Sequence, residues 1–297
     1  MTTVGRRPPH LRRSWLFLPG AEDHVLRAAP ALGADVLIQE LEDFTPPERR
    51  PEARCLSPVL LPAWRQAGRL AALRINPLED CGAEDLAAAM PGAPDIVMMS
   101  KVARPDQIRA LDAEITRHEA ALGLPIGSIE IVPNIESAAG LVETRAIAGA
   151  SPRVTACLLA AEDMAADLHA ERSLEGRELA YARSRFLVEC TAAGVVAIDC
   201  PFTFGDLLAA EADLRAARAL GYRAKSIVNT NQVALVNRLL TPGPEEVARA
   251  RRMVEAFTAA RAAGADRVEV DGLFVEVPTF LAAQRLLRRA EELAAFT

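Results

Sequence analysis

Aromatic residues and histidines are scarce in this sequence. Of its 297 residues, 4% are aromatic, and 34 lysines and arginines face 40 aspartates and glutamates. Surfaces that bind nucleic acid combine a basic stripe with aromatic stacking platforms, so we expect no nucleic-acid partner. The histidines are not spaced as metal ligands, which disfavours a zinc site; they are His10, His24, His118 and His169.

Long apolar runs and closely spaced cysteines are absent as well. Apolar residues make up 51% of the chain, but charges interrupt them, and no run reaches the roughly 18 residues that a membrane-spanning helix needs. The first 15 residues carry positive charges with no apolar segment behind them, and the five cysteines show no C-x-x-C spacing. We therefore expect a cytoplasmic protein with free thiols, no secretory signal and no membrane association.

The sequence contains eight short apolar runs rich in Val, Ile and Leu. Each run is followed by polar residues and then by a stretch with helical periodicity, such as residues 106–122 and 205–221. The runs cover residues 14–20, 34–43, 70–76, 94–101, 129–136, 154–163, 194–200 and 224–232. This alternation predicts a (β/α)8 TIM barrel over residues 12–240. A doubly wound open sheet also alternates, but its usual glycine-rich first turn is missing here.

The residues after the eighth run form a C-terminal extension, 241–297, that we assign to the same domain. Within residues 241–265, a Pro-Gly-Pro loop precedes a predicted long helix that begins at Glu245 and Glu246. Two short extended pieces then flank Gly272, and an amphipathic helix ends the chain. We expect this helical extension to include a lid segment, for which Gly272 supplies a hinge.

Polar residues gather where the eight predicted strands end. In a (β/α)8 barrel these ends converge on one mouth, where the chemistry takes place. The residues are Pro19, Gly20, Glu40, Glu42, Asp43, Arg74, Asn76, Ser100, Lys101, Asn134, Glu136, Glu162, Asp163, Asp199, Asn229 and Asn231.

Among these residues, Glu136 and Asp163 are the candidate metal ligands. Carboxylates that converge without histidine or cysteine favour Mg²⁺, with Mn²⁺ as an alternative. Mg²⁺ takes its remaining ligands from water and substrate, so the pair leaves positions open for an oxyacid. The planar fork of Arg74 suits a carboxylate. A metal beside an arginine predicts a site for a 2-oxo or 2-hydroxy acid.

Each candidate also has a structural interpretation. The role of Asp163 could be limited to capping a helix, and that of Arg74 to an ion pair with an acid of the second strand. Glu42 or Asp43 could cap a helix or hold a metal-bound water. Lys101 either cross-links the mouth or takes part in the reaction. Pro19 and Gly20 form a turn, and the free amide of Gly20 could approach a ligand.

Several motifs occur in an order and spacing that resemble the citrate lyase β-subunit-like acyl-CoA lyases of the HpcH/HpaI aldolase superfamily. The similarity extends from about residue 12 to the C-terminus. The motifs are RSWLFLPG, LEDFTPPERRPEAR, ALRINPL, PNIESAAGL, AAEDMAADL, YARSRFLVECTAAGVVAIDCPF and AKSIVNTNQVALVN.

This resemblance implies a magnesium site at Glu136 and Asp163 and a carboxylate-binding Arg74. It also implies cleavage of a 3-hydroxyacyl-CoA thioester, such as citramalyl-, malyl- or citryl-CoA, into an acyl-CoA and a 2-oxo acid. Glu276 matches an aspartate that handles a proton on the thioester enolate, either in its own or in a neighbouring subunit. A homo-oligomer, trimer or hexamer, is expected. We add Asp43 and Lys101 as candidate catalytic residues.

Some positions depart from the family pattern. Val228-Asn229-Thr230 replaces Ile-His-Pro after the eighth strand, and Ala28-Ala29 stands where the family often has Lys-Ala. Two alternatives therefore stay open: a CoA-independent 2-oxo acid aldolase and a non-catalytic oxyacid-binding homologue. Phe44 follows Asp43 where such aldolases carry a histidine, which argues against the first alternative.

Overall fold

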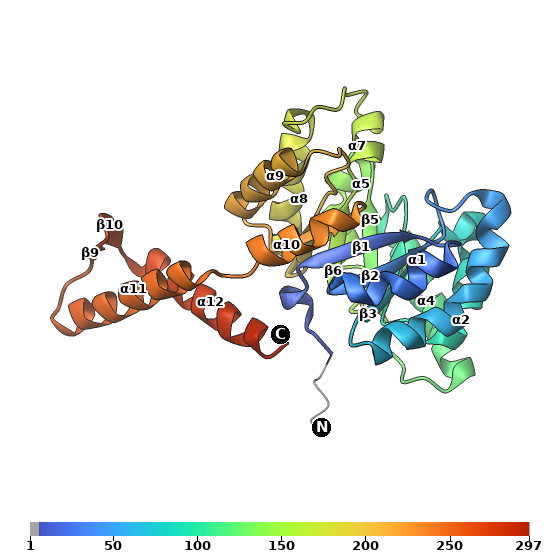
Figure 1. Ribbon diagram of the computed structural model, residues 1–297, viewed down its shortest axis with the longest axis horizontal. Helices are drawn as coiled ribbons and strands as arrows, with labels where there is room; N and C mark the ends of the chain where they lie inside the picture. Colours follow the sequence, from blue (N-terminus) through green and yellow to red (C-terminus); the bar gives the residue numbers. More distant parts are fainter. Residues whose placement is uncertain (1–5, 297) are drawn as a thin grey trace. The chain divides into compact units, whose positions relative to one another are not determined.

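The computed structural model describes residues 6–296, which form two compact units (Figure 1). One unit is Pro8–Arg238, and the other consists of residues 6–7 and 239–296. The division lies next to the boundary predicted at residue 240, although the sequence analysis counted both parts as one domain. Each unit has a hydrophobic core of its own.

The larger unit contains a closed barrel of eight parallel strands, as predicted. Each strand pairs with the next along the chain, and the eighth pairs with the first. The strands are β1 (Ser14–Pro19), β2 (Val36–Glu40), β3 (Leu70–Ile75), β4 (Ile96–Met99), β5 (Glu130–Ile135), β6 (Ala156–Leu159), β7 (Val196–Asp199) and β8 (Ala224–Ile227).

Helices follow the strands in the alternation that a (β/α)8 barrel requires (Figure 1). The α-helices of this unit are α1 (Asp23–Ala28), α2 (Arg50–Gln66), α3 (Ala83–Ala89), α4 (Pro105–Leu122), α5 (Ala138–Val142), α6 (Thr144–Ala148), α7 (Glu162–Asp167), α8 (Ala180–Ala193), α9 (Leu207–Leu220) and α10 (Val233–Leu239). The helices predicted over 106–122 and 205–221 correspond to α4 and α9.

The inside of the barrel is filled by every second side chain of the strands. One buried apolar cluster takes residues from all eight strands, including Phe17, Ile38, Ala72 and Val132. Because side chains alternate across a strand, the next inward positions toward the mouth are two residues further along. These positions include three residues with charged or amide side chains, which lie at the top of the barrel core: Glu40, Arg74 and Asn134.

Several predicted strands are shorter in the structure. β2 ends at Glu40, so Glu42 and Asp43 belong to the loop that follows. β6 ends at Leu159, and α7 begins three residues later at Glu162. Acidic side chains are stabilised in the first turn of a helix, where backbone N–H groups point outward. Asp163 therefore lies in a helix turn at the strand's end and not within the strand.

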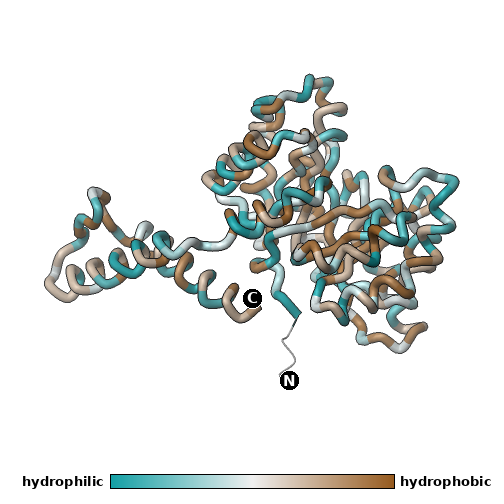
Figure 2. The backbone as a smooth tube through the Cα atoms, in the orientation of Figure 1, coloured by the Kyte–Doolittle hydropathy of each residue, from teal (hydrophilic) through white to brown (hydrophobic). Residues whose placement is uncertain are grey.

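The smaller unit is a helical hairpin interrupted by two short strands. It contains α11 (Pro244–Ala262), the antiparallel pair β9 (Val268–Val270) and β10 (Leu273–Val275), and α12 (Val277–Ala294). Both helices alternate between hydrophilic and hydrophobic residues (Figure 2). Their apolar sides meet around Met253, Phe257 and Phe280. Over residues 6–296, no helix has both the length and the hydropathy needed to cross a membrane.

Candidate active site

The loop after β2 folds around the carboxylate of Glu40. This side chain is fully buried and accepts hydrogen bonds from the backbone amides of Glu42, at 2.6 Å, and Phe44, at 2.5 Å. It also accepts a hydrogen bond from Nε of Arg74 at 2.8 Å. These contacts fix the loop and hold Glu42 and Asp43 at the mouth of the barrel.

Arg74 connects the acids of the mouth. Its Nη2 lies 3.1 Å from the carboxylate of Glu42, its Nη1 lies 3.8 Å from that of Glu136, and its guanidinium lies 5.0 Å from the ring centre of Phe17. Burial opposes the charge, but Glu40, Glu136 and Glu42 together raise the pKa of Arg74 further above its usual value. The ion pair between Arg74 and the acids at the end of β2 is confirmed. The binding of substrate by Arg74 stays a prediction.

Lys101 forms a second pair with Glu42. Its ammonium group donates a hydrogen bond to the Glu42 carboxylate and lies 3.7 Å from that of Asp43. Partial burial opposes the charge on Lys101, but the contact with Glu42 raises its pKa. Burial also raises the pKa of Glu42, while Arg74 and Lys101 act in the opposite direction. Lys101 therefore cross-links the mouth, since the Glu42 carboxylate accepts a hydrogen bond from Lys101 and forms an ion pair with Arg74.

Glu136 follows β5 and is 4% exposed. Neither of its carboxylate oxygens has a hydrogen-bond partner of regular geometry. Burial raises its pKa to about 8; Arg74 and the nearby amide of Lys101 counteract this shift, whereas Asp163 and Glu42 add to it. Glu136 is thus a buried acid with free lone pairs and a second carboxylate close by.

Asp163 is the second carboxylate. Ala161, not an acid, occupies the N-cap position of α7, and no side chain caps the helix there. The interpretation of Asp163 as only a helix cap is therefore wrong. Its neighbour Glu162 is exposed and engaged by Arg172 and Thr203, so the two acids that follow β6 have different surroundings.

Glu136 and Asp163 fit a hard divalent cation. A buried carboxyl group without a hydrogen-bond partner is costly, and a cation between two carboxylates removes both the desolvation and the repulsion that raise the pKa of Glu136. Among residues 6–296, no group of three or more His, Cys, Asp and Glu side chains is arranged to hold a metal. A metal held here would therefore take its other ligands from water or substrate, as Mg²⁺ commonly does.

Gly20 has a structural role that the sequence analysis did not predict. Its amide donates a hydrogen bond to Oγ1 of Thr45 at 3.0 Å, so it is not the free amide that was expected to approach a ligand. A Cβ atom on Gly20 would lie 2.0 Å from the carbonyl oxygen of Glu40. Glycine is needed because β1 and β2 approach closely at this point, where Pro19 is paired with Glu40.

Asp199 belongs to a separate buried network outside the barrel interior. It accepts hydrogen bonds from Arg183 at 2.7 Å and Lys225 at 2.6 Å, and both cations also contact Asp213. The network ties β7 and β8 to helices α8 and α9. Asp199 is therefore structural, and the expectation that it would lie with the other strand-end residues at the mouth is wrong.

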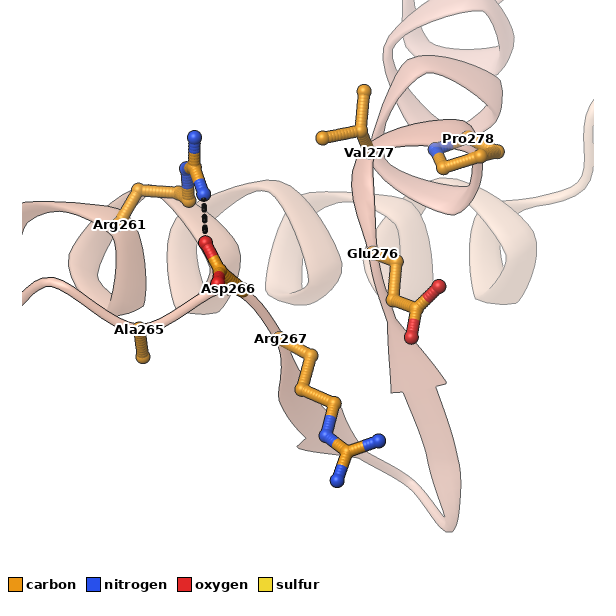
Figure 3. Close-up of a pocket in the computed structure, with 7 residues that line it drawn as sticks. All are labelled: Arg261, Ala265, Asp266, Arg267, Glu276, Val277 and Pro278. Carbon is orange, nitrogen blue, oxygen red and sulfur yellow. Dashed lines mark hydrogen bonds and ion pairs between the residues drawn. The ribbon is translucent and has the colours of Figure 1, made fainter.

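Glu276 lies in the smaller unit, between β10 and α12. It is exposed, and it occupies the N-cap position of α12 without a side-chain cap hydrogen bond. Figure 3 shows it with Arg267 in a pocket that also contains the ion pair between Arg261 and Asp266. The carboxylate is therefore accessible, and its catalytic role stays a prediction.

The structure brings most of the predicted site residues together at the mouth of the barrel. Arg74, Glu136 and Asp163 form the centre, and Asp43 and Lys101 lie toward the rim. Pairing of Arg74 with one acid of the second strand was an alternative from the sequence, but its simultaneous contacts with Glu40 and Glu42 were not predicted. The inward position of Glu40 could have been predicted from the alternation of side chains along β2. Nothing in the sequence indicates that the following loop turns Glu42 toward two cations.

Several known proteins are similar to this chain in sequence or in structure. The citrate lyase β subunit of Escherichia coli K12 is 34% identical over 293 residues, covering 97% of this chain and 96% of its own. The L-malyl-CoA/β-methylmalyl-CoA lyase of Cereibacter sphaeroides is 30% identical, covering 97% of this chain and 98% of its own.

Among solved structures, CitE of Mycobacterium tuberculosis in complex with magnesium, acetoacetate and coenzyme A superimposes with a TM-score of 0.74. It is 28% identical and covers 94% of this chain and 98% of its own. The family of HpcH/HpaI aldolases and citrate lyases matches residues 13–230, which include every candidate site residue except Glu276. The chain belongs to the HpcH/HpaI aldolase/citrate lyase family and is a lyase.

Proposed function

We propose that this protein is a metal-dependent lyase that cleaves, or forms, a 3-hydroxyacyl-CoA thioester. The products of cleavage are an acyl-CoA and a 2-oxo acid, and citramalyl-, malyl- and citryl-CoA are the candidate substrates. The observation that carries the proposal is the buried carboxylate of Glu136, which has no hydrogen-bond partner of regular geometry and lies close to Asp163 and Arg74. Relatives of similar length include a citrate lyase β subunit and a malyl-CoA lyase.

Glu136 and Asp163 would hold Mg²⁺, with Mn²⁺ as an alternative. The hydroxyl oxygen of the thioester becomes the carbonyl oxygen of the oxo acid on cleavage. The bound ion would act as a Lewis acid at this oxygen. The mouth supplies a low-dielectric setting for this chemistry, because Glu136 and Arg74 are nearly inaccessible to solvent. CitE of M. tuberculosis was crystallised with magnesium, which supports the choice of metal.

Arg74 would bind the carboxylate of the oxo acid as a permanently charged donor. Its Nε is engaged by Glu40 and one terminal nitrogen lies near Glu42, which holds the guanidinium in a fixed orientation. The nitrogen that faces Glu136 is 3.8 Å from that carboxylate and is the least engaged. This edge would face an acid bound beside Glu136.

In the cleavage direction, the bond between the hydroxyl-bearing carbon and the α-carbon of the thioester breaks. The electron pair of that bond passes into the thioester enolate, and the hydroxyl proton passes to a water molecule. The α-carbon then takes up a proton as the enolate collapses to the acyl-CoA. We assign delivery of that second proton to Glu276, in its own or in a neighbouring subunit of a trimer or hexamer. Its carboxylate is exposed and not committed to capping α12, as a proton-transfer group requires.

Asp43 and Lys101 would act at the rim of the mouth. Asp43 is exposed, and the ammonium group of Lys101 lies between it and Glu42. We assign to this pair the orientation of the thioester end of the substrate, since a cation at the rim can donate to a carbonyl oxygen. Pro19 and Gly20 would form the wall beside it, with Gly20 acting through its close packing and not through its amide.

The experiment that tests this function is an assay of acyl-CoA release from malyl-, citramalyl- and citryl-CoA. We expect turnover of at least one thioester with Mg²⁺ and none in excess chelator. Glu136→Gln should be inactive, while Glu48→Gln, which changes an exposed acid of the same unit, should retain activity. Undiminished turnover in chelator would refute the metal-dependent mechanism, and failure with all three thioesters in either direction would refute the substrate class.

A further inference from the structure

Asn134 is a buried amide without a hydrogen-bond partner inside the barrel. It is 0% exposed, and neither Oδ1 nor Nδ2 has a partner. Its backbone carbonyl, in contrast, accepts a hydrogen bond from the amide of Val102 at 3.1 Å. The missing contacts are therefore confined to the side chain.

The strand register places this side chain inside the barrel. Asn134 is paired with Leu158 and lies two residues beyond Val132, and both of these belong to the apolar cluster of the barrel interior. Two residues further along the same face is Glu136. Asn134 thus lies directly beneath the candidate metal ligand, on the floor of the mouth.

An unsatisfied amide at this depth needs an explanation. Leaving a buried donor or acceptor unpaired costs about 1–3 kcal/mol, whereas an apolar residue of the same shape is tolerated. Most buried polar side-chain atoms in proteins have a partner. Val132 and Leu158, which lie below and beside Asn134, are apolar and offer no partner. The mouth lies on the other side of the amide.

An oxo acid in the mouth requires more donors than Arg74 has free. Nε of Arg74 donates to Glu40, Nη2 lies 3.1 Å from Glu42, and only the edge near Glu136 remains. A carboxylate group has several lone pairs to satisfy, and the side-chain amide of Asn134 has two N–H donors. The unpaired amide and the incomplete set of donors occur at the same site.

We infer that Asn134 is a substrate-binding residue whose amide donates to the carboxylate of the 2-oxo acid from the floor of the barrel. This assignment rests on the proposed function, since it concerns the oxyacid held beside Glu136. It divides the recognition of the acid between a charged donor on β3 and a neutral donor on β5. The neutral donor adds no charge to a mouth in which acidic residues outnumber Arg74 and Lys101.

The test is calorimetric titration of pyruvate into the Mg²⁺-loaded full-length protein, with Asn134→Leu and Asn134→Ala as variants. We expect Kd for pyruvate to rise about tenfold to a hundredfold, the range expected for loss of a hydrogen bond to a charged group. The Kd for Mg²⁺ should stay at the wild-type value. Without ligand, Asn134→Leu should unfold at the wild-type temperature or above it, because no hydrogen bond is lost.

Asn237→Leu is the matched control. The amide of Asn237 accepts from Ser14 at 2.7 Å and donates to the carbonyl of Gly33 at 2.9 Å, so its loss should lower the unfolding temperature and leave the affinity for pyruvate unchanged. Wild-type affinity in both Asn134 variants would overturn the inference and assign the amide to an internal water. If the wild-type protein with Mg²⁺ does not bind pyruvate but binds glyoxylate or oxaloacetate, the 2-oxo acids formed from malyl- and citryl-CoA, the variants are compared with that acid. If it binds none of the three acids, the proposed function fails together with the inference.

Discussion

Replacing Glu136 by glutamine should stabilise the metal-free protein at alkaline pH. Burial, with Asp163 and Glu42, raises the pKa of Glu136 to about 8 from the usual 4.5. The folded protein therefore retains a proton that the unfolded chain has already released, and stability falls as pH rises from about 4.5 to about 8. Glutamine keeps the shape and removes this titration.

The size of the effect follows from the same numbers. The pKa of Glu136 rises from 4.5 to about 8, and each unit of pKa corresponds to about 1.4 kcal/mol. Ionisation of Glu136 therefore lowers the free energy of unfolding by at most about 5 kcal/mol. Relaxation of the mouth and entry of water reduce this figure. At pH 5 the carboxyl group is protonated in the folded state, so wild type and variant should differ little.

Urea unfolding in excess chelator at several pH values measures this effect. The two tryptophans, Trp15 and Trp64, are buried and lie in the barrel unit, so their fluorescence reports the unfolding of that unit. Glu48→Gln, which alters an exposed acid, should follow the wild-type profile. The argument would be refuted if Glu136→Gln lost stability between pH 5 and pH 9 as steeply as the wild type.

Three further substitutions test other parts of the site. Asp163→Asn should abolish Mg²⁺ binding in calorimetry while the metal-free protein keeps its unfolding temperature, and retained binding would remove Asp163 from the ligand set. Arg74→Lys should lower kcat/KM by about tenfold to a hundredfold, because a point charge cannot reproduce the contacts of a guanidinium; unchanged kinetics would make Arg74 purely structural. Glu276→Gln should slow deuterium exchange at the methyl group of acetyl-CoA, measured with the oxo acid present. The same variant should still bind the oxo acid, and wild-type exchange would exclude Glu276 from proton transfer.

The architecture of the barrel could be predicted from the sequence. Eight apolar runs separated by amphipathic stretches correspond to β1–β8, and the ends of these runs contain the residues of the mouth. The ends of the strands were harder to predict, because apolar residues continue past the point where the hydrogen-bonded ladder stops. This is why Asp163 was assigned to a strand and lies in α7.

The contacts within the mouth could not be predicted to the same degree. Residue types and strand order identified Glu136, Asp163 and Arg74, but not that Glu40 would fold the following loop or that Thr45 would engage the amide of Gly20. Such contacts depend on loop conformation, which has no periodic pattern in the sequence. A boundary near residue 240 was predicted from the sequence, but the separation of the two parts into units with their own cores was not. That separation depends on packing between distant segments, which leaves no local pattern in the sequence.

The most direct test of the central claim is calorimetric titration of Mg²⁺ into the protein at pH 7, repeated in buffers with different ionisation enthalpies. With a pKa of about 8, Glu136 is protonated at pH 7 in most molecules, so a metal that binds to its carboxylate must displace that proton. The account predicts one site per chain and the release of close to one proton for each ion, with both lost in Glu136→Gln. Mg²⁺ binding that releases no proton, or that persists in the variant, would contradict it.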